Sequence, residues 1–234
     1  MEYQTVFQRY ELKYMITPAQ KEKILQAMES YMALDQYGRT VIRNLYFDTE
    51  NYRLARKSIE RPVYKEKLRI RSYRQAAPDS PVFVELKKKY DSVVYKRRLA
   101  MPLLSAMDWV VGRQPCEEQS QISKELDYFL NYYQTLRPMA FLSYEREAFY
   151  DKAGGDFRVT FDDTILFRQE NLSLEAEVGG TPLLPEDQVL MEIKCSGGVP
   201  LWLSQVLTEE KIYKTSFSKY GNAYQTIIFP KEVA

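Results

Sequence analysis

Apolar and polar residues alternate along eight segments of the chain, which is typical of β-strands that have one apolar and one polar face. In residues 63–74, for example, Leu68 and Ile70 alternate with Arg69 and Arg71. Turn-forming residues separate most of these segments. The pattern predicts eight strands, at residues 7–15, 40–48, 63–74, 81–90, 92–101, 139–150, 156–167 and 188–196.

Six other segments have the 3.6-residue period or the end signals of helices. Residues 17–34 begin with Thr17 as N-cap, Pro18 at the first helical position and Gln20 completing a capping box. No internal repeat, low-complexity tract or linker interrupts the chain. We therefore expect one α+β domain over residues 1–234. The other five predicted helices lie at 48–59, 102–112, 120–136, 199–210 and 217–228.

The composition of the 234 residues is that of a globular protein, with 45% hydrophobic residues. No run approaches the roughly 18 apolar residues of a membrane span, and no apolar core of a signal peptide follows the N-terminus. Cys116 and Cys195 lie far apart and fit no metal or redox spacing. These features predict reduced thiols and a cytoplasmic location.

The distribution of charge narrows the chemistry further. The chain has no histidine, which excludes histidine triads, His-liganded zinc and histidine phosphotransfer. Its net charge of +1 hides a cationic segment, because residues 56–98 contain 14 Lys and Arg but 5 Asp and Glu. An anionic partner is expected.

The charged residues of the strands fall on one side, because residues two apart in a strand share a face. This side could be the water-facing surface of an ordinary amphipathic sheet. It could also line the inside of a barrel, since eight antiparallel strands suffice for closure and amphipathic helices could cover the apolar outside. We favour the barrel, because like charges accumulate on this side and a multiply charged anion would neutralise them. Examples of such pairs are Glu11 and Lys13, Glu85 and Lys87, and Glu192 and Lys194.

Nine motifs follow one another in an order that resembles the catalytic domain of the vacuolar transporter chaperone (VTC) family. That family makes inorganic polyphosphate and belongs to the triphosphate tunnel metalloenzymes. The resemblance implies an eight-stranded antiparallel β-barrel, a tunnel with a charged lumen covered by amphipathic helices. The motifs are ELK (11–13), NLYFDT (44–49), KLRIRSY (67–73), VELKKK (84–89), YKRR (95–98), YEREAF (144–149), RVTFD (158–162), MEIKC (191–195) and FSKY (217–220).

The resemblance also implies roles for individual residues. Eight cationic residues match positions that bind phosphates and act in catalysis, and Lys194 is a further phosphate-binding candidate on the same face. Glu192 resembles the metal-binding glutamate, with Glu11 as its candidate partner, and the expected cofactor is Mg²⁺ or Mn²⁺. The eight matched residues are Lys13, Arg69, Arg71, Lys87, Lys96, Arg146, Arg158 and Lys219.

Two positions depart from related sequences. Arg9 stands where the adenylate cyclase/thiamine triphosphatase branch has the first glutamate of its ExExK motif, which favours the polymerase-like branch. Ser216 stands where yeast-like relatives have a lysine, and Lys214 is the candidate replacement.

The resemblance implies a polyphosphate polymerase that transfers the γ-phosphoryl group of ATP to a growing polyphosphate chain and releases ADP. The expected partners are ATP and inorganic polyphosphate. We expect no nucleic acid and no membrane segment in this chain, and we leave a separate membrane partner open. The alternatives are a tunnel-type triphosphatase or tripolyphosphatase and a non-catalytic module that binds polyphosphate or nucleotides.

Overall fold

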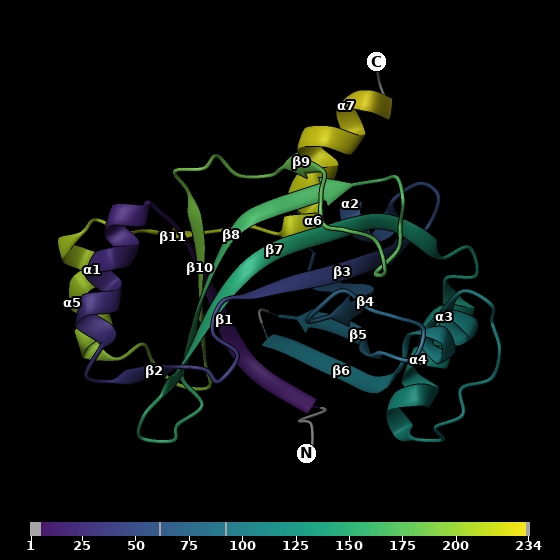
Figure 1. Ribbon diagram of the computed structural model, residues 1–234, viewed down its shortest axis with the longest axis horizontal. Helices are drawn as coiled ribbons and strands as arrows, with labels where there is room; N and C mark the ends of the chain where they lie inside the picture. Colours follow the sequence, from purple (N-terminus) through teal and green to yellow (C-terminus); the bar gives the residue numbers. More distant parts are fainter. Residues whose placement is uncertain (1–5, 61, 92, 233–234) are drawn as a thin grey trace.

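One antiparallel sheet dominates the computed structural model, which describes residues 6–60, 62–91 and 93–232, without the side chains of residues 6–9 and 232 (Figure 1). All eight predicted strands are present, so the α+β class and the strand pattern are confirmed. They are β1 (Val6–Ile16), β3 (Thr40–Asp48), β4 (Tyr64–Ser72), β5 (Pro81–Tyr90), β6 (Val93–Pro102), β7 (Arg137–Asp151), β8 (Arg158–Arg168) and β10 (Val189–Cys195).

The described sheet has eleven strands rather than eight, because three short strands join it. They are β2 (Met32–Leu34), β9 (Thr181–Pro182) and β11 (Lys214–Thr215). The first of them corrects the helix predicted for residues 17–34. Helix α1 (Pro18–Met28) has the predicted capping box but ends early. Met32 continues the apolar spacing of the helix, yet it is buried from a strand and pairs with β7.

The eight long strands follow the order β7-β3-β4-β5-β6-β1-β10-β8, and β7 also pairs with β8. The predicted closed barrel is not complete along its length. Strand β1 pairs with β6 only through Val6–Arg9, and its remaining residues, from Tyr10 to Ile16, pair with β10. Beyond Arg9, β11 takes the place of β6 beside β1. The sheet is therefore open between β1 and β6 over part of its height.

Two apolar clusters lie on the face opposite the charged residues. Helices α3 (Leu103–Val110) and α4 (Gln121–Tyr132) cover β3–β6. Helices α1 and α5 (Leu201–Glu209) cover β1, β8 and β10 at the other side of the molecule (Figure 1). Ile70, Val84, Phe161 and Ile193 are almost fully buried in these clusters, as the alternation of the strands predicts.

A third apolar cluster lies on the charged face itself, which differs from the expected cover of helices on the outside alone. It includes Ile42, Leu142 and Leu190, which share a face with Asn44 and Glu192 of the same strands. Helix α6 (Lys219–Ala223) and the π-helical turn η1 (Tyr224–Ile228) pack there, followed by α7 (Phe229–Glu232). The start of α6 therefore lies beside the charged residues.

Asp48 links this C-terminal segment to helix α2 (Arg53–Ile59). Its carboxylate accepts hydrogen bonds from the backbone N–H groups of Leu54 and Ala55, at 2.8 and 2.9 Å, and from the hydroxyl of Tyr220 at 3.1 Å. The ring of Tyr220 stacks on Tyr46 of β3, with 4.9 Å between centroids. These contacts fix α6 against β3.

Within the described ranges, no helix is long and apolar enough to cross a membrane. Cys116 and Cys195 are both buried free thiols, as predicted.

Candidate functional site

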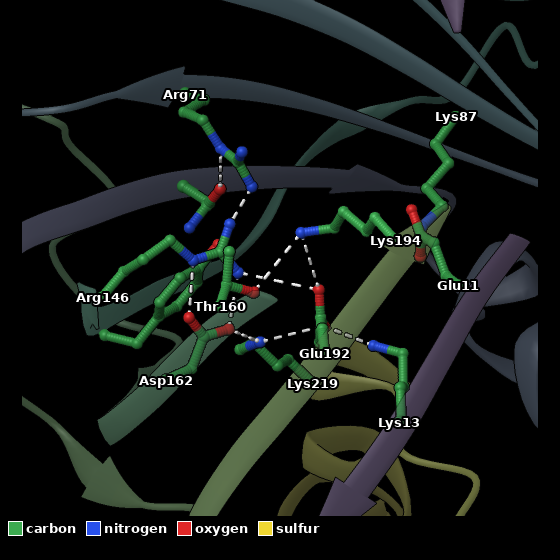
Figure 2. A network of polar contacts seen from close by, with 12 residues as sticks. Glu11, Lys13, Arg71, Lys87, Arg146, Thr160, Asp162, Glu192, Lys194 and Lys219 are labelled. Atoms are coloured by element: carbon green, nitrogen blue, oxygen red, sulfur yellow. Dashed lines mark hydrogen bonds and ion pairs between the residues drawn. The ribbon is translucent and has the colours of Figure 1, made fainter. Parts of the chain in front are cut away.

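Two carboxylates on neighbouring strands form the centre of a buried polar network, Asp162 on β8 and Glu192 on β10 (Figure 2). Arg146 of β7 forms a bidentate pair with Asp162, in which Nε donates to Oδ1 at 2.5 Å and Nη2 donates to Oδ2 at 2.6 Å. Lys219, the first residue of α6, reaches Oδ2 of Asp162 at 2.5 Å. A two-pronged arginine contact holds both partners in a fixed orientation.

Glu192 is surrounded by cations. Its Oε1 lies 2.5 Å from Nζ of Lys13 and 3.6 Å from Nζ of Lys219. Its Oε2 lies 3.3 Å from Nζ of Lys194 and 3.7 Å from Nη2 of Arg146. Burial alone would raise the pKa of Glu192, but these cations hold it well below its usual range. We call Asp162, Glu192, Lys13, Arg146, Lys194 and Lys219 the first cluster.

A second cluster surrounds Glu85 of β5, whose side chain is 1% exposed. Nε of Arg69 donates to Oε2 of Glu85 at 2.8 Å, and Nε of Arg71 lies 3.7 Å from the same oxygen. Lys96 of β6 forms an ion pair with Oε1. Burial would raise the pKa of Glu85, but Arg71, Lys96 and Arg69 hold it well below its usual range. These four residues, from three adjacent strands, form the second cluster.

Tyr144 of β7 connects the two clusters. Its hydroxyl accepts a hydrogen bond from Nη2 of Arg71 at 3.0 Å, and Nζ of Lys219 lies 4.4 Å from its ring centre. Burial raises its pKa, but the charges of Arg146, Arg71 and Lys219 outweigh burial and lower the pKa of Tyr144 to about 8. The hydroxyl is thus an unusually acidic group inside the cationic network.

Two further lysines lie on the same sheet face as the clusters, Lys67 on β4 and Lys87 on β5. Nζ of Lys87 binds Oε2 of Glu11 at 2.6 Å. Burial opposes ionisation of Glu11, but Lys87 and other cations lower its pKa to about 2. Nζ of Lys67 donates to the hydroxyl of Ser218 at 2.7 Å.

The charged residues are mostly shielded from water, which contradicts the alternative of a solvated sheet face. The side chains of Asp162, Glu85 and Glu192 are 0%, 1% and 8% exposed. Counting both clusters with Glu11, Lys67 and Lys87, nine cations face four carboxylates, a formal surplus of five positive charges. Buried charge of one sign is costly without a counter-ion. The arrangement is therefore suited to a multiply charged anion.

The same burial weakens the basicity of two lysines. Burial lowers the pKa of Lys96 to about 7, although Glu85 opposes the shift. Burial likewise lowers the pKa of Lys194 to about 8, although Glu192 opposes it. Both amines can therefore change their protonation near neutral pH when an anion enters.

Glu192 and Glu11 were the predicted metal ligands. In the described part of the chain, no group of three or more Asp, Glu, Cys or His side chains is arranged to hold a metal ion. The two glutamates are nevertheless close enough for the charge of Glu192 to raise the pKa of Glu11. Carboxylate oxygens are the donors that Mg²⁺ and Mn²⁺ prefer, and such ions are often held by one or two carboxylates together with substrate phosphates. The pair fits a metal of that kind.

Ten of the eleven predicted site residues lie in the first and second clusters or in the Lys87–Glu11 pair. Arg158 does not join them, because it is exposed at the first position of β8. Within the described residues its side chain makes no hydrogen bond or ion pair. Lys214 is exposed in β11 and makes no ion pair in the described ranges, and its replacement of the lysine absent at Ser216 stays a prediction. The side chain of Arg9 lies outside what the structure describes.

Four residues of the network were not among the sequence candidates. The two-residue period places Asp162, Glu85 and Lys67 on the same strand face as predicted residues, but no role in the site was predicted for them. Tyr144 shares its face with Arg146. Cations of the opposite parity are separated from the network, because Lys88 and Arg97 pair with Glu125 of α4 instead.

Comparison with known proteins assigns the chain to a family. The family model described as the VTC domain matches residues 8–228. The chain belongs to the VTC domain family. The resemblance inferred from the nine motifs is therefore confirmed. No curated protein matches the sequence at a significant level.

Solved structures share the fold of this VTC domain at low sequence identity. A putative adenylate cyclase from Bacillus halodurans superposes with a TM-score of 0.60 at 13% identity, over 96% of this chain and 99% of the other. A putative adenylyl cyclase from Hippeastrum, described as having a dominant triphosphatase activity, has a TM-score of 0.57 at 15% identity, over 93% and 95%. At these identities the likeness concerns the fold.

Proposed function

We propose that this chain is a polyphosphate polymerase, which transfers the γ-phosphoryl group of ATP to the end of an inorganic polyphosphate chain and releases ADP. The observation that carries the proposal is the surplus of five positive charges on one buried sheet face. Membership of the VTC domain family supports it.

We also propose that the eight long strands form the wall of a tunnel. Each of them pairs with two of the others, and the β7–β8 pairing returns the order to its start. The charged face would line this tunnel, and the gap between β1 and β6 would open it on one side. A linear anion could then lie along the charged face while both of its ends remain accessible.

Arg69 and Arg71 are proposed to bind the phosphates of ATP, because guanidinium groups donate in pairs and stay charged. Lys87, Lys96 and Arg146 are proposed to neutralise the remaining phosphate oxygens. The lysines and Arg146 of the first cluster would hold the acceptor chain. Alignment of donor and acceptor and neutralisation of charge are the main needs of phosphoryl transfer.

The reaction breaks the bond between the γ-phosphorus and the oxygen that bridges it to the β-phosphate, and ADP keeps that oxygen. A terminal oxygen of polyphosphate forms the new bond. This oxygen is already deprotonated near neutral pH, so the site needs no general base. A Mg²⁺ or Mn²⁺ held by Glu192 and Glu11 would, when bound, neutralise charge on the phosphate oxygens.

A tunnel-type triphosphatase is the second candidate, in which water replaces the polyphosphate acceptor. The burial of the first cluster favours the polymerase, because the attacking group must enter a site shielded from bulk water. A module that binds polyphosphate or nucleotides without turnover is the third candidate.

Incubation with ATP and Mn²⁺, followed by gel analysis of phosphate chains, distinguishes the three. Polymerisation yields long chains and ADP, whereas free phosphate alone refutes it in favour of hydrolysis, and binding without turnover favours the third candidate. Arg71→Ala should abolish triphosphate binding, and Glu192→Ala should keep binding but remove metal-dependent turnover. Arg97→Ala is the matched control, because Arg97 lies on the opposite face and pairs with Glu125.

A further inference from the structure

Lys67 is a half-buried cation of the network for which the proposed mechanism has no role. It lies on β4 two residues before Arg69, so the two side chains share a face. Its Nζ donates to the hydroxyl of Ser218 at 2.7 Å. Ser218 precedes α6 and accepts a second hydrogen bond from the N–H of Gly221 at 3.1 Å. The amine is thus held in place from the C-terminal segment.

The charges that act most strongly on Lys67 are positive. They come from Lys87 on β5, Lys13 on β1, and Lys65 and Arg69 on its own strand. In residues 6–60, 62–91 and 93–232, no carboxylate forms an ion pair with Lys67. Among the described residues, this half-buried amine therefore has no carboxylate as counter-ion.

The carboxylates near this end of the site are already engaged. Asp48 directly follows Phe47, which pairs with Leu68 of β4. Its carboxylate accepts hydrogen bonds from the backbone of α2 and from the hydroxyl of Tyr220. Glu11 binds Lys87. Neither is recorded as a partner of Lys67.

Burial and the four neighbouring cations hold the pKa of Lys67 well below its usual range. The amine therefore loses charge readily when the site holds no anion. An entering anion would neutralise the neighbouring cations and favour the protonated amine. Binding would then be linked to proton uptake.

We propose that Lys67 is a further phosphate-binding residue, which holds the stretch of a linear polyphosphate that passes between the second cluster at Arg69 and the first cluster at Lys13. Its place on the strand face of Arg69, together with its hydrogen bond to Ser218, the residue directly before Lys219 of the first cluster, carries the inference. The inference rests on the proposed function only in taking linear polyphosphate as the ligand. Ser218 is a positioning residue for the amine.

The test is calorimetric titration of Lys67→Met and Lys67→Arg with orthophosphate, tripolyphosphate and long-chain polyphosphate. Lys67→Met should weaken binding of the two linear polyphosphates by roughly 10- to 100-fold, the loss expected for one charged hydrogen bond, and change orthophosphate binding little. Lys67→Arg should recover much of the affinity. Lys124→Met is the control, because Lys124 is exposed on α4.

Titration in two buffers of different ionisation enthalpy, at pH 8, adds a readout that a structural role would not move. The wild-type protein should take up protons when it binds tripolyphosphate, and both Lys67 variants should take up fewer. Lys67→Arg is the decisive variant, because an arginine stays charged and should keep the affinity for tripolyphosphate while losing the proton uptake. It also serves where Lys67→Met does not fold.

Equal affinity and equal proton uptake in the wild-type protein and the variants would overturn the inference, as would a wild-type protein that binds no linear polyphosphate. A wild-type protein that binds polyphosphate in the predicted manner but makes none from ATP supports the inference and refutes the polymerase. The two proposals therefore fail separately.

Discussion

Glu85→Gln tests whether a buried carboxylate stabilises the folded protein by neutralising the cations of the site when no anion is bound. The side chain of Glu85 is 1% exposed and contacts Arg69, Arg71 and Lys96. The substitution keeps the shape and a hydrogen-bond acceptor but leaves three cations without their common counter-charge. Removal of one partner from a buried ion pair costs about 3–5 kcal/mol.

The lower end of that range applies, because Arg69 and Lys96 are 17% and 18% exposed and water relieves part of the repulsion. For a protein of this size, about 3 kcal/mol corresponds to a fall in melting temperature of roughly 6–12 °C. Tripolyphosphate should restore more stability to the variant than to the wild-type protein, since it supplies the missing charge.

Thermal unfolding followed by circular dichroism, with and without tripolyphosphate, measures both effects. Glu125→Gln is the matched control. Glu125 pairs with Lys88 and Arg97 on the opposite face and is 22% exposed, so its loss should cost about 0–1 kcal/mol and leave the effect of tripolyphosphate unchanged. A fall of less than about 2 °C for Glu85→Gln, with the same gain from tripolyphosphate as in the wild-type protein, would refute the reasoning.

Three further predictions concern pH. The pKa values of Lys96, about 7, and Lys194, about 8, lie below that of a lysine in the unfolded chain, so the unfolded chain binds more protons above pH 7. The melting temperature without anion should therefore rise from pH 7 to 9. Lys96→Met should reduce that rise. Affinity for tripolyphosphate should fall over the same interval, because the lysines lose charge, and an affinity independent of pH in calorimetry would contradict this. Absorbance at about 295 nm should reveal one tyrosine that ionises near pH 8 and disappears in Tyr144→Phe, while an unchanged titration curve would show that the acidic hydroxyl is another.

The sequence predicts which side chains share a face of each strand, because side chains alternate between two faces and only two assignments are possible. Once Leu68 and Ile70 were placed in the core, Arg69 and Arg71 had to share the other face. The same rule separated Arg97 from Lys96. The motifs then identified the family, which no single strand could do.

Other features depend on tertiary contacts, which the alternation of apolar and polar residues cannot predict. The period of a helix did not reveal that Met32 would be buried from β2. Arg158 has the correct parity but lies at the end of its strand, where it is exposed. The place of α6 on the charged face depends on the packing of Tyr220 against Tyr46 and on its bond to Asp48, and these residues come from distant parts of the chain.

The ratio of cations to carboxylates expresses a balance between folding and binding. With no carboxylates, nine largely shielded cations would repel one another and destabilise the empty protein. With nine, the cations would be neutralised and an anion would gain little by entering. Asp162, Glu85 and Glu192 instead orient the cations around them, and Lys67, Lys96 and Lys194 reduce the remaining repulsion because they can lose their protons. If the proposed function holds, an entering polyphosphate would restore those protons, and the charge that the site presents would increase with the charge of the anion it holds.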